Sequence, residues 1–346
     1  METFTETKIY EDMERNNKIK NIDIKPTTAK AYVRNVIKLL KLINANSYSA
    51  LITEFDKLTE FFKKEENGKR LYSDNTIKNY INCILMVGSW DLCKDINPDK
   101  IEPIIDYYSQ TKEKINNKQM DNTKPDNDEW ITTKEFDNIL KRMRKQVDNN
   151  GTTEQLQDFI IMLLYSGKWI RPLRNDYAGM CFSKIHHEVK DHNYIWVQEN
   201  KDASDNVLDR RFTIVLNDDK VSKHYGAKEY KIAKLTILSN YLDLLYERRG
   251  DVVDGFTPTA ATIIKRDFLV NPQDNKPMSK NNLTKNLQRI TQTWLNKKVS
   301  TSALRHMYIS NLDHNKTTNK KLNQIAKDMR HSIKTQQENY KLVDAN

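Results

Sequence analysis

The chain has 346 residues but only three cysteines, and no two of them form a C-x-x-C pair. Cys83, Cys93 and Cys181 therefore predict neither a disulfide framework nor a cysteine zinc site, and they are typical of reduced thiols in an intracellular compartment. With 8 Gly and 8 Pro, collagen-like and low-complexity classes are excluded. No apolar run approaches the roughly 20 residues of a membrane-spanning helix. The first residues are polar and acidic, so we expect no signal or transit peptide and no membrane partner.

Positive charge is in excess. There are 57 Lys and Arg against 47 Asp and Glu, which gives a net charge of +10 and a pI near 9.2. Such an excess favours polyanionic partners, because a protein that neutralises phosphates releases the counterions of a nucleic acid. Lys, Asn and Ile are abundant together, however, and this is also typical of AT-rich genomes. The charge opens a nucleic-acid hypothesis without deciding it.

The chain is long enough for two domains. Residues 1–25 lack strong periodicity and predict an N-terminal arm or a short leading helix. Residues 26–115 show helical periodicity in four segments, with Thr27 or Thr28 as the N-cap of the first, and predict a compact helical bundle. Residues 116–129 are rich in Asn, Asp and Lys without apolar periodicity, which is typical of a linker. A second domain is expected over residues 130–346.

The second domain combines helices with a few strands. An apolar helix is expected around residues 156–167, before three candidate strands at Tyr194–Gln198, Arg211–Leu216 and Glu229–Ile232. Further helices are expected at residues 235–250, 280–296, 301–313, 319–329 and 335–343. The predicted fold class is mainly α with a small antiparallel β-sheet, an α+β arrangement.

Two blocks near the end of the sequence carry chemistry. SALRHMYISNL covers residues 302–312, and MRHSIKTQQENYKLV covers residues 329–343, where His331 lies nine residues before Tyr340. These blocks resemble the second and third signature boxes of the tyrosine recombinase family, in which Arg stands in an H-x-L-R-H box and a later His lies nine residues before the nucleophilic Tyr. The resemblance implies that Arg305, His331 and Tyr340 are catalytic.

The first signature arginine of that family follows an apolar helix that ends in a glycine-containing turn. The sequence LLYSGKWIRPLRNDYAGM at residues 163–180 has this setting, and Arg174 is our assignment, with Asp176 as its acidic neighbour. Arg171 is the rival. The motif P-L-R-N-D-Y is similar to the corresponding sequence in integrases of large DNA viruses of eukaryotes and their mobile elements.

The family also has a lysine in a turn between two strands. Lys220 is our choice, because its surroundings K-x-x-K-x-Y-G resemble the wording of related viral proteins. Lys201, in the preceding turn, and Lys223 are the alternatives.

These residue types suit phosphodiester transfer. Two guanidiniums, Arg174 and Arg305, would hold the non-bridging oxygens through charge-assisted hydrogen bonds, without a metal or another cofactor. The resemblance implies that Tyr340 attacks the phosphorus and forms a 3′-phosphotyrosine. His331 would then hydrogen-bond the phosphate or assist proton movement, and Lys220 would protonate the departing 5′ oxygen.

One position departs from the family. Ser302 stands three residues before Arg305, where His is usual, and a serine donates a hydrogen bond but does not act as an acid or base near neutral pH. His306 is interpreted as a buried hydrogen-bonding residue.

The resemblance implies a site-specific recombinase or integrase that binds double-stranded DNA and assembles on it as a homotetramer. Two alternatives stay open. One is a DNA-binding relative that no longer cleaves strands, for which Ser302 is the warning sign. The other is an interaction protein whose basic surface reflects genome composition.

Overall fold

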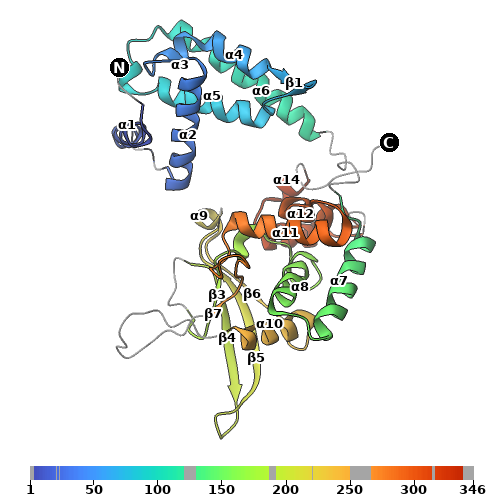
Figure 1. Cartoon of the computed structure of the whole chain (residues 1–346). Coiled ribbons are helices and arrows are strands. Elements are labelled where there is room, and N and C mark those ends of the chain that lie inside the picture. Colours follow the sequence, from blue (N-terminus) through green and yellow to red (C-terminus); the bar gives the residue numbers. More distant parts are fainter. Residues whose placement is uncertain are drawn as a thin grey trace, which may run out of the picture. The chain divides into compact units, whose positions relative to one another are not determined.

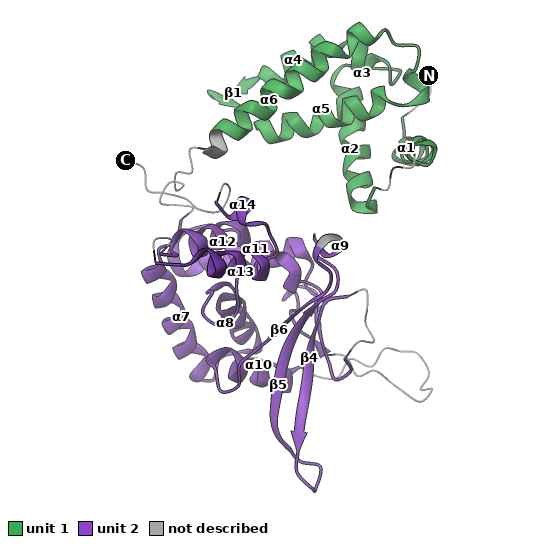
Figure 2. Cartoon of the chain, turned by 180° about the vertical axis from the view of Figure 1, so that it is seen from behind, with its two compact units in different colours: residues 1–121 green, residues 122–346 purple. Residues whose placement is uncertain are grey.

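The computed structural model of the chain describes residues 4–20, 22, 24–120, 130–186, 192–219, 221–249, 266–313 and 316–337. The chain separates into two compact units, residues 1–121 and 122–346, which Figure 1 colours along the sequence and Figure 2 colours by unit. The fold is mainly α-helical with a small β-sheet, as predicted.

Unit 1 is a helical bundle. Its elements are α1 (Glu6–Ile19), α2 (Pro26–Leu42), α3 (Ala50–Thr53), α4 (Phe55–Lys63), the two-residue strands β1 (Glu65–Glu66) and β2 (Lys69–Arg70), α5 (Asp74–Gly88), the 3-10 turns η1 (Asp91–Cys93) and η2 (Pro98–Lys100), and α6 (Glu102–Met120). The apolar stripes of α2, α4 and α5 face one core that includes Leu39, Phe62 and Ile81. Amphipathic helices of this length gain most of their stability from such packing.

Three local expectations for unit 1 need correction. Of the two alternatives for residues 1–25, the structure shows the helix: α1 places Ile9 and Met13 in the core. The first long helix has no side-chain cap, because it starts with Pro26, whose fixed φ suits the first helical position. The predicted linker begins too early, since residues 116–120 continue α6, while residues 121–129 lie outside the described residues.

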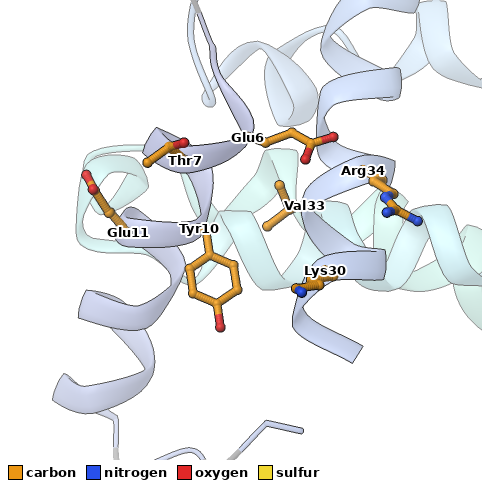
Figure 3. Close-up of a pocket in the computed structure, with 7 residues that line it drawn as sticks. All are labelled: Glu6, Thr7, Tyr10, Glu11, Lys30, Val33 and Arg34. Atoms are coloured by element: carbon orange, nitrogen blue, oxygen red, sulfur yellow. The ribbon is translucent and has the colours of Figure 1, made fainter. Parts of the chain in front are cut away.

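A hollow in unit 1 lies between α1 and α2, with a volume of about 440 Å³. Figure 3 shows its lining, which mixes acidic and basic side chains: Glu6, Thr7, Tyr10, Glu11, Lys30, Val33 and Arg34. None of the predicted site residues belongs to this hollow.

Unit 2 is built around α8. Its elements are α7 (Thr133–Asp148), α8 (Thr153–Tyr165), η3 (Asn175–Tyr177), β3 (Cys181–Ser183), β4 (Tyr194–Lys201), β5 (Val207–Leu216), α9 (Ser222–Tyr225), β6 (Lys228–Lys231), α10 (Ile237–Arg248), β7 (Arg266–Asp267), α11 (Lys280–Leu295), α12 (Thr301–Ser310), α13 (Asn319–Asp328) and α14 (Ile333–Thr335). In Figure 1, α8 lies at the centre with α7, α10 and α11 around it and the sheet on one side.

Helix α8 is apolar nearly all round because it is buried on every side. Its N-terminus and that of α7 both begin with a capping box, formed by Thr152 with Gln155 and by Thr132 with Glu135. In each box the two side chains satisfy backbone N–H groups that the helix leaves without an internal partner. These caps fix where α8 begins. They thereby also fix where the segment that bears Arg174 begins, after the end of α8.

The sheet has the order β6-β5-β4-β3-β7. Strands β4, β5 and β6 form antiparallel pairs, and β7 adds to β3 antiparallel. The pair β3 and β4 is parallel, with Cys181 opposite Tyr194, so the sheet is mixed where the sequence predicted an antiparallel one. The prediction missed β3 and β7 because strands of two or three residues carry too few positions to show a period.

None of the described helices combines the length and the apolar character that a membrane crossing demands.

Candidate active site

Arg305 lies in the middle of α12 and is completely buried. The helix begins at Ser300, whose hydroxyl accepts a hydrogen bond from the backbone N–H of Ala303 at 3.2 Å. The Arg305 side chain is 0% exposed. Its Nη1 donates to the Pro172 carbonyl oxygen at 2.5 Å, and its Nη2 donates to the Met329 carbonyl oxygen at 2.9 Å. A buried guanidinium needs such acceptors, because burying an unpaired charge is very costly.

The same guanidinium fixes the tautomer of His331. Arg305 Nη2 lies 3.0 Å from His331 Nδ1. A guanidinium has donors and no acceptor, so Nδ1 must accept this hydrogen bond and the neutral ring carries its proton on Nε2. His331 Nε2 lies 3.3 Å from Gln336 Oε1, an acceptor for that proton. His331 in this state is a hydrogen-bond donor through Nε2.

Burial and charge keep His331 neutral. Its side chain is 5% exposed, and burial, followed by the positive charge of Arg305, lowers the pKa of His331 to about 4. The hydrogen bond with Gln336 acts in the opposite direction and is outweighed. Near neutral pH the ring is therefore uncharged and adds no positive charge beside Arg305.

The backbone that presents His331 is a helix-terminating turn. Helix α13 ends at Asp328, the N–H of Arg330 donates to the Lys327 carbonyl, and the N–H of His331 donates to the Ala326 carbonyl. These two bonds define a Schellman motif, whose left-handed position is usually glycine. Here Arg330 occupies it, with φ +60°.

Arg174 is joined to this turn from a segment far away in the sequence. The segment follows α8, and its Arg174 Nη1 donates to the Arg330 carbonyl oxygen at 3.1 Å. The hydroxyl of Tyr165, at the end of α8, donates to the Arg174 carbonyl oxygen at 2.7 Å and holds the backbone there. The charge of Arg174 also contributes to the low pKa of His331.

Arg171, the rival of Arg174, points elsewhere. Its guanidinium lies 5.5 Å from the ring centroid of Tyr308, and its Nη1 is 3.4 Å from the Gly167 carbonyl oxygen. A cation over an aromatic face is a satisfied structural arrangement. Among the described residues, the structure therefore gathers Arg174, Arg305 and His331, and leaves Arg171 outside this group.

The predicted nucleophile and the preferred candidate for the lysine cannot be located in the same way. Tyr340 and Lys220 both lie outside the described residues, as does the side chain of Lys223. Lys201 is described: it ends β4 in an exposed hairpin, where its Nζ lies 2.8 Å from Asp205 Oδ1.

The two remaining predicted residues lie on α12. Ser302 is exposed in the first turn of the helix, one turn before Arg305. His306 is half-buried, so the prediction that it is a buried residue holds only in part.

Three further groups act on this cluster: the sequence pointed to Asp176 as the neighbour of Arg174, but it gave no sign of Asp219 and Lys280. Asp176 is almost fully buried, and burial, with the neighbouring Asp219 next, raises its pKa, while Lys280, Arg174 and Arg305 act in the opposite direction. Lys280 is exposed at the start of α11. Only the three-dimensional fold brings Asp219 and Lys280 to this cluster, since neither belongs to the signature blocks.

The cluster suits an anion and offers no metal site. Arg174, Arg305 and the Nε2–H of His331 are donors, and donors of this kind bind the oxygens of a phosphate. Within the residues that the structure describes, no group of three or more His, Cys, Asp or Glu side chains could hold a metal ion.

Comparisons with known proteins give little beyond this geometry. No family model matches the sequence, and no curated protein matches it. Among solved structures, the chain is similar to the crystal structure of XerA recombinase, with a TM-score of 0.37 and 11% identity, over 98% of this chain and 95% of that chain. A likeness at this level carries no argument, and the proposals below rest on the residues.

Proposed function

We propose that the chain is a tyrosine-type site-specific DNA recombinase, which cuts and rejoins DNA strands through a covalent bond to Tyr340. One observation carries the proposal: Arg305, His331 and Arg174 meet around residues 329–331, although they come from three separate segments. No single motif requires these three residues to lie together in the folded chain.

In the proposed step, Tyr340 Oη attacks the phosphorus of a DNA phosphodiester. The new bond joins Oη to phosphorus, and the bond between phosphorus and the 5′ oxygen breaks. The phenolic proton leaves to solvent, while Lys220 supplies a proton to the departing 5′ oxygen. Arg174 and Arg305 stabilise the charge on the non-bridging oxygens. Rejoining is the reverse step with another 5′ hydroxyl, so no ATP is needed.

The tautomer of His331 limits what this residue can do in the proposed step. Its Nδ1 accepts from Arg305, and its Nε2 carries a proton. A ring in this state has no lone pair for the phenolic proton of Tyr340. We assign His331 as a hydrogen-bond donor to the phosphate, in place of Gln336, and not as the general base.

The proposal also requires a change at Arg305. Its side chain is 0% exposed and donates to two carbonyl oxygens and to His331. Arg305 therefore reaches a phosphate only after one of these acceptors is exchanged, which we expect DNA binding to cause. The same proposal has both units, the helical unit 1 and unit 2, bind DNA. It also has four chains assemble on two recombination sites.

Formation of the covalent adduct tests the proposal. The protein is incubated with a pool of nicked duplexes of random sequence, because a nick lets the cut fragment diffuse away and traps the intermediate. We expect an adduct that resists denaturation in the wild type and is lost in Tyr340→Phe. DNA binding without any adduct across the pool would instead support the alternative, a DNA-binding relative that does not cleave.

A further inference from the structure

A buried ion pair joins the segment before His331 to the segment that bears Lys220. Arg330 Nε lies 2.5 Å from Asp219 Oδ2, and Arg330 Nη2 lies 3.1 Å from Asp219 Oδ1, so the pair is bidentate. Arg330 Nη2 also donates to the Gly226 carbonyl oxygen at 2.7 Å. Arg330 is 3% exposed and Asp219 is 2% exposed. One guanidinium thus holds the chain between β5 and β6 at two points, on either side of residue 220.

The position of Arg330 is costly in two respects. Its φ of +60° lies in the left-handed region, which is unfavourable for a residue with a Cβ. Its charge is also removed from water, which is offset only by excellent geometry and full pairing. A glycine would satisfy the turn without either cost. The contacts of the Arg330 side chain with Asp219 and Gly226 therefore explain why an arginine stands at this position, and the turn itself does not.

The acceptor side of the pair is equally constrained. Asp219 Oδ1 also accepts from the backbone N–H of Val221 at 2.9 Å, and the Ser222 hydroxyl donates to the Asp219 carbonyl at 3.1 Å. Burial alone would raise the pKa of Asp219, but the hydrogen bonds from Arg330 and Val221 outweigh it and hold that pKa below its usual range. The carboxylate is thus ionised and turned toward Arg330.

The turn that carries His331 is held from the other side by the catalytic arginines. Met329 accepts from Arg305 and the Arg330 carbonyl accepts from Arg174. The Arg330 side chain extends the same turn toward Asp219, the residue directly before Lys220 in the sequence.

We propose that Arg330 and Asp219 are positioning residues, which set the lysine-bearing segment at residues 217–226 against the His331 turn. The inference rests on the proposed function, because it assumes that Lys220 protonates the departing 5′ oxygen. The proposal gives the pair no contact with the phosphate or with Tyr340. Its contribution is the placement of the proton donor, and misplacement of a donor by about 1 Å is enough to slow a reaction about 100-fold.

A substrate whose leaving group needs no proton distinguishes misplacement of the proton donor from a general loss of activity. The cleavage site is first mapped from the DNA ends in the wild-type adduct. Two duplexes are then compared at that site, one ordinary and one with sulfur in place of the bridging 5′ oxygen. A thiolate leaves without protonation, because thiols have a pKa near 8.5. Attack on the sulfur substrate therefore depends on the arginines and Tyr340 and not on the proton donor.

Two variants break the pair differently. Arg330→Gly keeps a residue suited to the left-handed turn and removes the guanidinium, while Asp219→Asn keeps the shape of the acceptor and removes its charge. We expect each to cleave the ordinary duplex about 10- to 100-fold more slowly than wild type, and the sulfur duplex at close to the wild-type rate. Lys220→Ala should show the same selective pattern.

Asp158→Asn is the matched control. It breaks another ion pair of unit 2, in which Arg289 Nη2, on a partly exposed side chain, lies 2.5 Å from Oδ2 of the buried Asp158. This variant should lose stability without distinguishing the two substrates. Equal slowing of both substrates by Arg330→Gly and Asp219→Asn, or no slowing at all, would overturn the positioning role. Wild-type protein that forms no adduct with any duplex would overturn the proposed function, and the positioning role with it.

Discussion

At the scale of single residues, Arg305 and His331 show how two buried polar groups stabilise each other. Arg305 keeps its charge because three acceptors surround it, and His331 loses its charge because it is buried and, second, because Arg305 lies beside it. The pair is thus ordered before any ligand arrives. In the proposed reaction, Arg305 first exchanges one acceptor for the phosphate, and the donors then stabilise developing charge without further rearrangement.

The burial of His331 predicts a pH dependence of stability. Its pKa falls to about 4 in the folded chain, below the ordinary value of 6.5. Between these two values the unfolded chain binds the proton more readily, so the free energy of unfolding decreases as the pH falls from about 6.5 to about 4. The full effect is on the order of 3 kcal/mol.

Denaturant titrations at pH 7 and pH 5 check this. We expect His331→Asn to lose less unfolding free energy between the two pH values than wild type does. Equal losses in both proteins would show that His331 titrates normally in the folded chain.

The two rival arginines are distinguished by conservative substitution. Arg174 contacts the His331 turn, whereas Arg171 packs on Tyr308. We expect Arg174→Lys to slow adduct formation by about 10²–10³-fold, because a lysine cannot supply the paired planar donors. Arg171→Lys should form adduct at close to the wild-type rate. The opposite ranking, measured on the same nicked duplex, would exchange the two assignments.

At the scale of elements, the long periodic helices were predictable and the short strands were not. The expected helix at residues 280–296 is α11 (Lys280–Leu295); for α7 the sequence allows Thr132 or Thr133 as the N-cap, and the structure shows Thr132 with Glu135. The second expected helix of unit 1 is instead two pieces, α3 and α4, separated at Glu54. Its apolar residues continue through the break, so periodicity gave no sign of it.

The candidate site was predictable only as far as its motifs. The blocks around Arg305 and His331 could be found by their wording, but the tautomer of His331 and the buried pair of Arg330 and Asp219 could not. These features depend on contacts between residues that lie 26 and 111 positions apart. A sequence pattern carries no information about which side chains meet over such separations.

The α7 cap offers a test of local stability. Thr132 Oγ1 accepts from the Glu135 backbone N–H at 3.2 Å. Thr132→Ala should lower the free energy of unfolding by about 1 kcal/mol, because the first turn of α7 loses an acceptor. Urea titration measures this, with Thr133→Ala as the control, since that substitution leaves the cap in place. Equal effects of the two substitutions would contradict the assigned cap.

At the scale of the whole molecule, the net charge of +10 predicts how DNA binding responds to salt. If the chain contacts 6–10 phosphates, its affinity for duplex DNA should fall by about 10³–10⁵ between 50 and 200 mM salt. Titrations at several salt concentrations give the slope. A flat response would favour an interaction protein whose lysines reflect genome composition.

The most direct test of the whole account is the identity of the residue that bonds to DNA. The wild-type adduct is digested with nuclease and trypsin, and the peptides are analysed by mass spectrometry. We predict a nucleotide attached to Tyr340 in the peptide TQQENYK, residues 335–341, and to no other tyrosine. A nucleotide on a different residue, or none in any peptide of an active preparation, would contradict the assignment of Tyr340 as the nucleophile.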